Sequence, residues 1–223
     1  MEHIAMADRP VEISLRYGVV RGKIDNCYRV VSEAGVVRAE RADGCLMVPD
    51  AGDLVLIDSG AGKSFDKLVS NIEWLGLDPK RLKTVLVTHA HIDHIGALHR
   101  FQQEYGVQII AHELDAAAIE EGRGTAAEAY DVRYTPCHVD MRLQSAEEIL
   151  RFGVHELKVI HIPGHTPGSV AAYLDTDNKR VLFGQDIHGP YYPEWGADPA
   201  HARLSLRKLL ELKADILCVE RQR

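Results

Sequence analysis

Apolar and polar side chains alternate along two early stretches of the chain, residues 11–20 and 26–32. A period of two is typical of a strand with one buried face, so both stretches are predicted to contain strands. Residues 53–60, DLVLIDSG, form a short apolar run that ends at Gly60 and predicts a more fully buried strand. Helical spacing follows until Pro79 stops it. The apolar positions at that spacing are Phe65, Leu68, Val69, Ile72 and Leu75.

Strands and helices alternate through the rest of the chain. By the same patterns, strands are predicted over residues 83–89, 107–112, 147–153, 155–165, 168–175, 179–186 and 215–219. Helices are predicted over residues 64–77, 97–106 and 199–214. Helices between strands are typical of an α/β protein. No linker or shift of composition divides the 223 residues, so a single domain over 1–223 is expected.

Residues 112–145 have a less regular pattern, with helical pieces broken by Gly122 and Gly124. We expect this segment to be an insertion, either a lid over a cleft or an ordinary packed excursion. As a lid, it would contribute side chains that contact a substrate. The candidates for that contact are Tyr130, Tyr134 and His138.

Composition and charge indicate which partners and which cellular location to expect. The chain carries 26 Lys and Arg against 33 Asp and Glu, a net charge of −7, which disfavours nucleic acid or an anionic membrane as a partner. We find no signal-peptide pattern, and no apolar run approaches the roughly 18 residues of a membrane span. A soluble cytoplasmic protein is therefore expected. The four scattered cysteines are interpreted as small buried residues, with Cys137 as an alternative pocket residue.

Three histidines and an aspartate crowd into the stretch THAHIDHIG, directly after a predicted buried strand. Side chains two positions apart on an extended segment point to the same side, so His89, His91 and Asp93 are expected to face one space. His94 joins them only if the chain turns, and Gly96 is expected to permit that turn. Imidazole and carboxylate groups suit zinc, iron and manganese, so the stretch predicts a metal site.

Two later segments carry matching chemistry. His165, in IPGHTPGS, follows the end of a predicted strand and is flanked by residues that build a tight loop. Asp186, in LFGQDIHGP, also follows a strand directly. Three strands thus end in loops with metal-type ligands, and strand ends are where rigid scaffolds usually present their chemistry.

These motifs together resemble those of the metallo-β-lactamase-fold hydrolase superfamily, in its glyoxalase-II-like branch. HAHIDH matches the H-x-H-x-D-H motif, PGHTPGS the second histidine motif and FGQD the bridging-aspartate motif. LVLIDSG resembles the early strand whose aspartate, here Asp58, supports the metal loop. The resemblance implies an αββα sandwich, two mixed sheets flanked by helices, with the metal site in a cleft at one edge.

The resemblance also implies a division of the ligands between two metal ions. His89, His91 and His165 would hold the first ion. Asp93 and His94 would belong to the second, with Asp186 as the bridge. The family chemistry is a metal-bound hydroxide that attacks a polarised carbonyl, with Asp93 orienting the nucleophile or taking up its proton. One or two zinc ions are expected, with iron or manganese as alternatives.

The chain departs from the family pattern at its end. Family members carry one more histidine shortly after the last strand, whereas here ADILCV is followed by ERQR and no histidine follows His201. The second site is therefore expected to be the weaker. Three explanations stand open: an altered or truncated C-terminus, substitution by His188 as a ligand, or function with one tightly bound ion.

An aromatic segment, HGPYYPEW, follows the predicted bridging aspartate. Tyr191, Tyr192 and Trp195 are expected to form either a pocket wall or a dimer contact. His161 is interpreted as a strand residue near the site. The remaining histidines are predicted to lie at the surface or on helix faces, and they are His99, His112, His155 and His201.

The leading functional hypothesis is a metallohydrolase of a small ester, thioester, lactone or amide. A mononuclear iron persulfide dioxygenase is the alternative, with His89, His165 and Asp186 around one iron. A non-enzymatic, degenerate metal-binding scaffold is a third hypothesis. A nuclease is disfavoured by the net charge of −7. The same fold serves many reactions, so the motifs alone do not identify a substrate.

Overall fold

The structure is a computed structural model. It describes residues 11–218 apart from 16–17, 23–28, 33–34, 40–43, 48–52, 64, 75, 154, 177, 185, 188 and 190. Up to residue 52, it describes the path and pairing of the strands only. The proposed ligand His188 and the terminal residues 219–223 lie outside the described residues.

The first sheet has nine strands, which are neighbours in the order of the chain. They are β1 (Val11–Leu15), β2 (Gly18–Gly22), β3 (Arg29–Ser32), β4 (Gly35–Ala39), β5 (Gly44–Met47), β6 (Leu54–Ile57), β7 (Leu82–Leu86), β8 (Gln108–His112) and β9 (Met141–Leu143). The pairs from β1 to β6 are antiparallel, whereas those from β6 to β9 are parallel. Parallel strands end at the same edge of a sheet, so the loops after β6, β7 and β8 lie together.

The second sheet has five strands, again in chain order. They are β10 (Glu147–Phe152), β11 (His155–His161), β12 (Val170–Thr176), β13 (Lys179–Phe183) and β14 (Ile216–Cys218). The first four form an antiparallel meander, and β14 runs parallel to β13. The predicted hairpin around Gly153 is present, since Phe152 pairs with His155.

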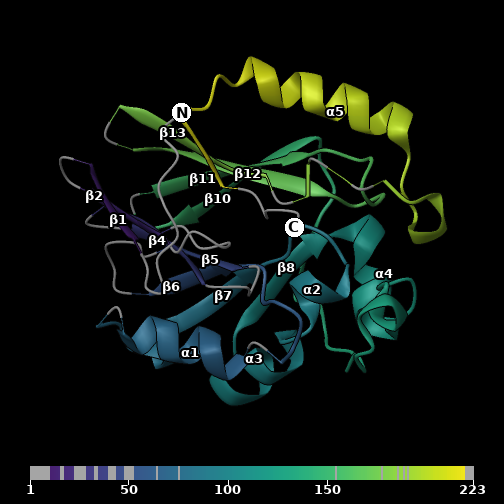
Figure 1. The fold of residues 1–223 in the computed structure, drawn as a ribbon, viewed down its shortest axis with the longest axis horizontal. Helices are drawn as coiled ribbons and strands as arrows, with labels where there is room; N and C mark the ends of the chain where they lie inside the picture. Colours follow the sequence, from purple (N-terminus) through teal and green to yellow (C-terminus); the bar gives the residue numbers. More distant parts are fainter. Residues whose placement is uncertain are drawn as a thin grey trace.

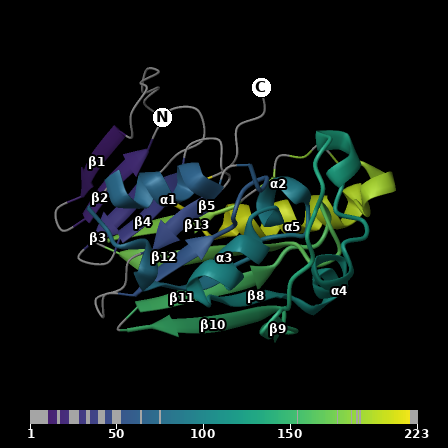
Figure 2. The ribbon, with the colours of Figure 1, turned by 90° about the horizontal axis from the view of Figure 1, so that it is seen from below.

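The helices cover the outer faces of the two sheets. They are α1 (Phe65–Trp74), α2 (Ile92–Ile95), α3 (Leu98–Tyr105), α4 (Glu113–Glu121) and α5 (Pro199–Glu211), with 3-10 turns at Pro79–Arg81, Ala127–Tyr130 and Pro193–Trp195. Helices α1 and α3 lie below the first sheet in Figure 1, and α5 crosses above the second. Figure 2, seen from below, shows α1 and α3 in front of the first sheet. The predicted αββα sandwich is confirmed.

Alternation along the strands creates three apolar layers. On β12, Val170, Ala172 and Leu174 pack into the layer between the sheets, whereas Ala171 and Tyr173 pack beneath α5. The third layer lies between the first sheet and α1, α3 and α4, and includes Phe65, Leu68, Val85, Ile109 and Ile119. A strand with apolar residues on both faces must lie inside such a sandwich, because each face is covered.

Two segments are more complex than their patterns alone show. Residues 11–20 contain strands, as predicted: β1 and β2 pair as a hairpin in which Leu15 lies opposite Gly18. The segment 112–145 contains more than helical pieces, since β9 joins the edge of the first sheet beside β8. Its proposed role as a lid stays a prediction. Among the described residues, no helix combines the length and the apolar character that crossing a membrane would need.

Gly96 follows α2 for a reason other than the predicted one. Its φ is −62°, an ordinary helical value, so the turn itself does not require glycine. A Cβ at this position would instead lie 2.4 Å from the carbonyl carbon of Ala61 and 2.5 Å from the nitrogen of Gly62. The loop after β7 and the loop after β6 therefore pack backbone against backbone, which only glycine permits.

We expect Gly96→Ala to destabilise the protein by about 1–3 kcal/mol, because the added methyl group forces these two loops apart. Urea unfolding followed by circular dichroism measures the change. Gly76→Ala shows the effect of backbone strain without a clash: its φ is +75° and no atom lies within 4 Å of the added Cβ. A Gly96→Ala variant as stable as the wild type would contradict the steric explanation.

Candidate metal centre

The loop after β7 brings its four predicted ligands into the interior. His89, His91, Asp93 and His94 are exposed by only 2%, 5%, 7% and 0%. His91 is the N-cap residue of the short helix α2, which supplies the turn that places His94 beside the others. Groups this polar are rarely buried without partners, so their neighbours show what the loop is built to hold.

Asp58 anchors this loop to the end of β6. Its carboxylate accepts hydrogen bonds from the Thr88 nitrogen at 2.7 Å and the Thr88 hydroxyl at 2.6 Å. The same carboxylate lies 2.9 Å from Nδ1 of His94. Asp58 is fully buried and has a φ of +61°, a strained value for a residue with a side chain. The geometry agrees with a role in supporting the loop.

The loop after β11 presents His165 and is held by α5. A Cβ on Gly164, whose φ is +146°, would lie 2.4 Å from the Cα of Ala202. The Ser205 hydroxyl donates to the Pro163 carbonyl at 2.7 Å, and the Asp198 nitrogen donates to the Gly164 carbonyl at 2.8 Å. The close approach of α5 thus explains the P-G-H sequence.

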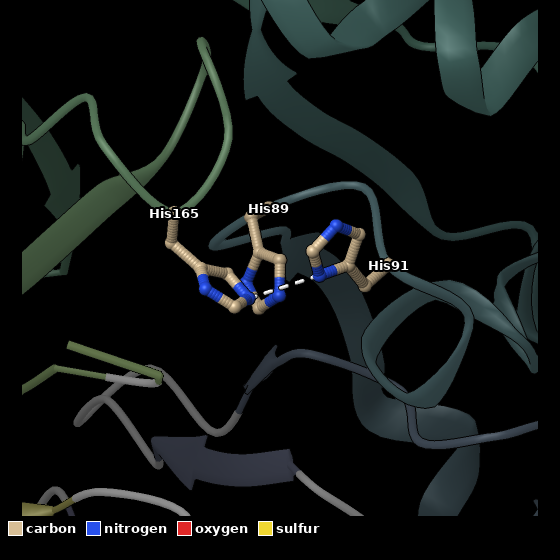
Figure 3. Close-up of side chains that lie close together, drawn as sticks. All are labelled: His89, His91 and His165. Atoms are coloured by element: carbon tan, nitrogen blue, oxygen red, sulfur yellow. Dashed lines mark hydrogen bonds between the residues drawn. The ribbon is translucent and has the colours of Figure 1, made fainter. Parts of the chain in front are cut away.

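Three histidines from these two loops converge in one place (Figure 3). His89, His91 and His165 each offer a nitrogen, and the three nitrogens lie within 4.8 Å of one another. Nδ1 of His91 and Nε2 of His165 are 2.9 Å apart. Two nitrogens on one tetrahedral zinc, each at about 2.0–2.1 Å, would be separated by about 3.3 Å, so the cluster is close to that size.

Asp186 and His94 form a second set with His89. The three offer ligand atoms that also lie within 4.8 Å of one another. Oδ2 of Asp186 is 3.7 Å from Nε2 of His89, 3.4 Å from that of His94 and 3.3 Å from that of His165. Asp186 therefore lies between the two sets, and its φ of +49° shows that its backbone is also strained.

Asp93 stands slightly apart from that second set. Its Oδ2 accepts a hydrogen bond of 2.6 Å from the hydroxyl of Tyr130 and lies 3.8 Å from Nε2 of His94. The tyrosine comes from the insertion, at the end of the 3-10 turn Ala127–Tyr130. This charge-assisted hydrogen bond is one of the contacts that tie the segment 112–145 to the loop after β7.

The donor set fits a divalent transition metal. Within the described part of the chain, no hydrogen-bond partner is found for Nε2 of His89 or Oδ1 of Asp186, both buried. Buried polar atoms of this kind are costly unless a partner binds them. Neutral imidazole and carboxylate are ligands that zinc, iron and manganese accept.

The electrostatics of the cluster favour neutral imidazoles where a metal would bind. Burial, followed by the charge of neighbouring imidazoles, lowers the pKa of His89 well below its ordinary value and that of His91 to about 3. Burial alone would also lower the pKa of His94, but three carboxylates outweigh it and hold that pKa well above its ordinary value. These carboxylates are Asp93, Asp58 and Asp186. His89 and His91 are thus ready to donate lone pairs.

A comparison with known families decides the classification. The sequence profile of the family described as the metallo-beta-lactamase superfamily matches residues 45–220. The chain belongs to the metallo-beta-lactamase superfamily. A second profile, described as a protein of unknown function, matches residues 18–65.

Several proteins are similar to this chain in sequence. The hydroxyacylglutathione hydrolase GloC of Haemophilus influenzae is 28% identical over 189 residues, which cover 82% of this chain and 86% of GloC. The uncharacterized protein YobT of Bacillus subtilis is 30% identical over 146 residues, covering 63% of this chain and 60% of YobT. A hydroxyacylglutathione hydrolase of Bartonella quintana is 31% identical over 136 residues, covering 61% of this chain. The match spans only 44% of that Bartonella protein.

Solved structures of the superfamily share the fold. A mutant metallo-beta-lactamase of Cronobacter sakazakii has a TM-score of 0.73 at 22% identity, covering 94% of this chain and 79% of that one. The metallo-beta-lactamase GOB-18 of Elizabethkingia meningoseptica has a TM-score of 0.69 at 25% identity, covering 99% of this chain and 80% of that one. The predicted family and fold are confirmed.

The structure places the other predicted site residues in different surroundings. The ring of Tyr191 lies 6.1 Å from that of His165, and Tyr192 packs 4.9 Å from Trp195. The Tyr134 hydroxyl donates to the Ile119 carbonyl at 3.0 Å, and its ring packs against the core below the first sheet. The side chain of His138 is 71% exposed and pairs with Glu120 at 3.1 Å. Tyr134 and His138 thus have partners outside the cluster.

The structure corrects the prediction for His112 and brings in Asp115, which the sequence motifs did not point to. His112 was predicted to lie at the surface, but that prediction is wrong: it is 3% exposed and its ring stacks on His161 at 3.9 Å. Asp115, 3% exposed, contacts both metal-site loops and was not singled out at all. The one sequence signal for it is an acidic residue in the first turn of a helix that directly follows a strand. Cys137 is a buried core residue, as expected.

The raised pKa of His94 predicts its charge in the metal-free protein. That pKa lies above the ordinary value of about 6.5, which an unfolded chain would have. Below pH 6.5, the contribution of the charged His94 ring to the stability of the fold is therefore fully present. It is lost as the pH rises through the folded-state pKa. In ¹⁵N NMR of metal-free protein at pH 7, His94 should give the signals of a charged ring, whereas His89 and His91 give those of neutral rings. His94→Gln assigns the signal, and a neutral His94 would contradict the prediction.

Proposed function

We propose that this protein is a metal-dependent hydrolase that cleaves a small-molecule thioester or ester. The observation that carries the proposal is the convergence of His89, His91 and His165 within 4.8 Å. The likeness to GloC, which extends over 86% of that hydroxyacylglutathione hydrolase, supports a thioester as the bond that is cleaved. Lactones and amides are alternative substrates for the same chemistry.

In this proposal, His89, His91 and His165 would hold one divalent ion, with zinc as the proposed identity and iron or manganese as alternatives. Asp93 and His94 would hold a second, with Asp186 shared. When bound, such an ion polarises a carbonyl group and lowers the pKa of water so that hydroxide forms near neutral pH. The position of Asp186 Oδ2, between 3.3 and 3.7 Å from three histidine nitrogens, supports its role as the shared ligand.

The proposed chemistry gives Asp93 and Tyr130 complementary roles. In this proposal, the Asp93 carboxylate would accept a proton from the attacking water. The Tyr130 hydroxyl, donating to Oδ2 at 2.6 Å, fixes the orientation of that carboxylate. Because Tyr130 is 46% exposed, its ring also borders the route by which a substrate would arrive.

We assign the aromatic segment to one side of the substrate pocket. The indole of Trp195 lies 6.0 Å from the His91 ring, and Tyr191 lies 6.1 Å from the His165 ring. Flat aromatic faces beside two proposed ligands suit an apolar portion of a small molecule. A contact between two copies of the chain through Tyr192 is the alternative role for the same segment. The net charge of −7 supports a small molecule over nucleic acid or a membrane as partner.

A mononuclear iron dioxygenase acting on a persulfide is the second candidate. The contact of Asp93 with Tyr130 favours it, since that carboxylate oxygen is already engaged. His89, His165 and Asp186 would then surround one ion, consistent with separations of 3.3 and 3.7 Å from the carboxylate. Iron content together with oxygen uptake on a persulfide would favour this candidate, and hydrolysis of a thioester panel by zinc-loaded protein would favour the first.

We expect protein purified without added metal to retain about one ion per chain after dialysis and to lose a second easily. The reason is that His89 and His91 are held neutral, whereas a second ion must displace the proton of His94. Mass spectrometry with inductively coupled plasma counts the ions. His165→Ala should retain almost none, and His201→Ala, changed at an exposed histidine on α5, should match the wild type. Two ions that survive dialysis would contradict this expectation.

Asp93→Asn should lower kcat for the best substrate of the panel by about 10²- to 10⁴-fold, because the proton acceptor is lost. Tyr130→Phe should lower kcat by about tenfold, the equivalent of one hydrogen bond to a charged group. Steady-state kinetics on metal-loaded protein measure both. His201→Ala, changed at an exposed histidine on α5, should behave as the wild type. Equal activity of Asp93→Asn and wild type would exclude the proposed role.

A further inference from the structure

A single carboxylate joins the two loops that carry the histidine cluster. Asp115 lies in the first turn of α4 and is 3% exposed. Its Oδ2 accepts hydrogen bonds from the Ala90 nitrogen at 2.9 Å and the Thr166 hydroxyl at 2.7 Å. Its Oδ1 accepts one from the Gly168 nitrogen at 2.7 Å. Two loops separated by more than seventy residues in the chain thus share one acceptor.

The Asp115 carboxylate does not cap α4, the helix to which it belongs. The N-cap residue of α4 is His112, whose Nδ1 accepts a hydrogen bond from the Leu114 nitrogen at 3.3 Å. Both oxygens of Asp115 are turned instead toward the loops. Burial raises the pKa of the Asp115 carboxyl, and the hydrogen bonds from Thr166, Ala90 and Gly168 oppose that rise. A buried carboxylate is costly unless several donors compensate it, so this arrangement is specific.

Two of the three donors are neighbours, in the chain, of histidines of the cluster. Ala90 lies between His89 and His91, and Thr166 is the residue next to His165. Asp58, the other buried aspartate behind the site, contacts Thr88 and His94, both on the first loop. Asp115 instead links the H-x-H segment to the H-T-P-G segment, through Ala90 on one side and through Thr166 and Gly168 on the other.

The fit around the carboxylate is tight. A Cβ on Gly168 would lie 2.6 Å from both Cγ and Oδ1 of Asp115. A larger residue at 168 would therefore displace the carboxylate from its donors. One further bond joins the bases of the loops, from the Val170 nitrogen to the Thr88 carbonyl at 2.8 Å. Losing Asp115 would therefore change the spacing of the histidines without separating the two strands.

We infer that Asp115 is a positioning residue that sets the distance between His165 and the pair His89 and His91, and so the affinity of the three-histidine site for a divalent transition-metal ion. The inference rests on the proposed metal site and is independent of which bond the protein hydrolyses. Partners that orient metal ligands from behind typically contribute 10- to 100-fold in metal affinity.

The test titrates Co²⁺ into metal-free protein and its variants, following the visible absorption bands of the bound ion. We expect Asp115→Asn to raise the Kd for Co²⁺ by about 10- to 100-fold and to alter the band shape. The amide can still accept from one loop, but its NH₂ group opposes an N–H donor of the other. Thermal unfolding of the metal-free variant reports its folding separately.

Asp140→Asn is the matched control, because Asp140 accepts the Ile109 nitrogen at 2.8 Å but contacts Gln102 and not the metal-site loops. It should lower stability without changing Co²⁺ affinity. Thr166→Val, which removes one donor, should give a Kd between those of wild type and Asp115→Asn, and Gly168→Ala should raise the Kd by displacing the carboxylate. These two variants test the inference if Asp115→Asn does not fold.

Wild-type Co²⁺ affinity and bands in Asp115→Asn, or in both Thr166→Val and Gly168→Ala, would overturn the inference. Wild-type protein that binds no Co²⁺ would overturn the metal site and the inference together. Wild-type protein that binds Co²⁺ but cleaves none of the thioesters or esters would overturn the proposed reaction alone. The failures of the two proposals are thus distinguishable.

Discussion

The cost of burying carboxylates governs the architecture of this site. Asp58 and Asp115 are withdrawn from water at 0% and 3% exposure, and each must recover through hydrogen bonds what it loses in hydration. Each does so by accepting from the backbone of a metal-site loop. The loops cannot relax without leaving a buried charge without partners. Their conformation is therefore fixed by electrostatics as well as by packing.

The two-sheet sandwich brings these carboxylates and loops next to one another. Parallel strands β6, β7 and β8 deliver Asp58, the H-x-H loop and α4 to one edge of the first sheet. The second sheet delivers His165 and Asp186 from β11 and β13. Apolar side chains fill the layers on both faces of β12. This packing holds the two sheets together firmly enough to keep ligands from different sheets at fixed distances from one another.

The sequence predicts much of this fold and part of the site. Periodicity locates most strands and helices, since residues such as those of β12 face two apolar layers and leave a clear pattern. The histidine motifs are local and dense, so they are visible without a structure. Asp115 could not be found in the same way, because its importance depends on Ala90 and Gly168, which are distant in the chain. His112 was misassigned for a similar reason: its burial follows from stacking on a residue of the other sheet.

Gly96 offers a related lesson, because glycine was expected for its conformational freedom and is required for its lack of a side chain. A side chain is also excluded at Gly168 by Asp115 and at Gly164 by Ala202, and at Gly164 the φ of +146° favours glycine as well. At these three points, main chain meets its neighbour with no room for a methyl group. These close contacts behind the histidine cluster cannot open without disturbing the fold.

A substrate would reach the histidines from the side of Tyr130 and Tyr192, whose rings are 46% and 43% exposed. Selection among substrates would then fall to these exposed aromatic side chains, whereas the packed interior would hold the histidines in the same place for every substrate.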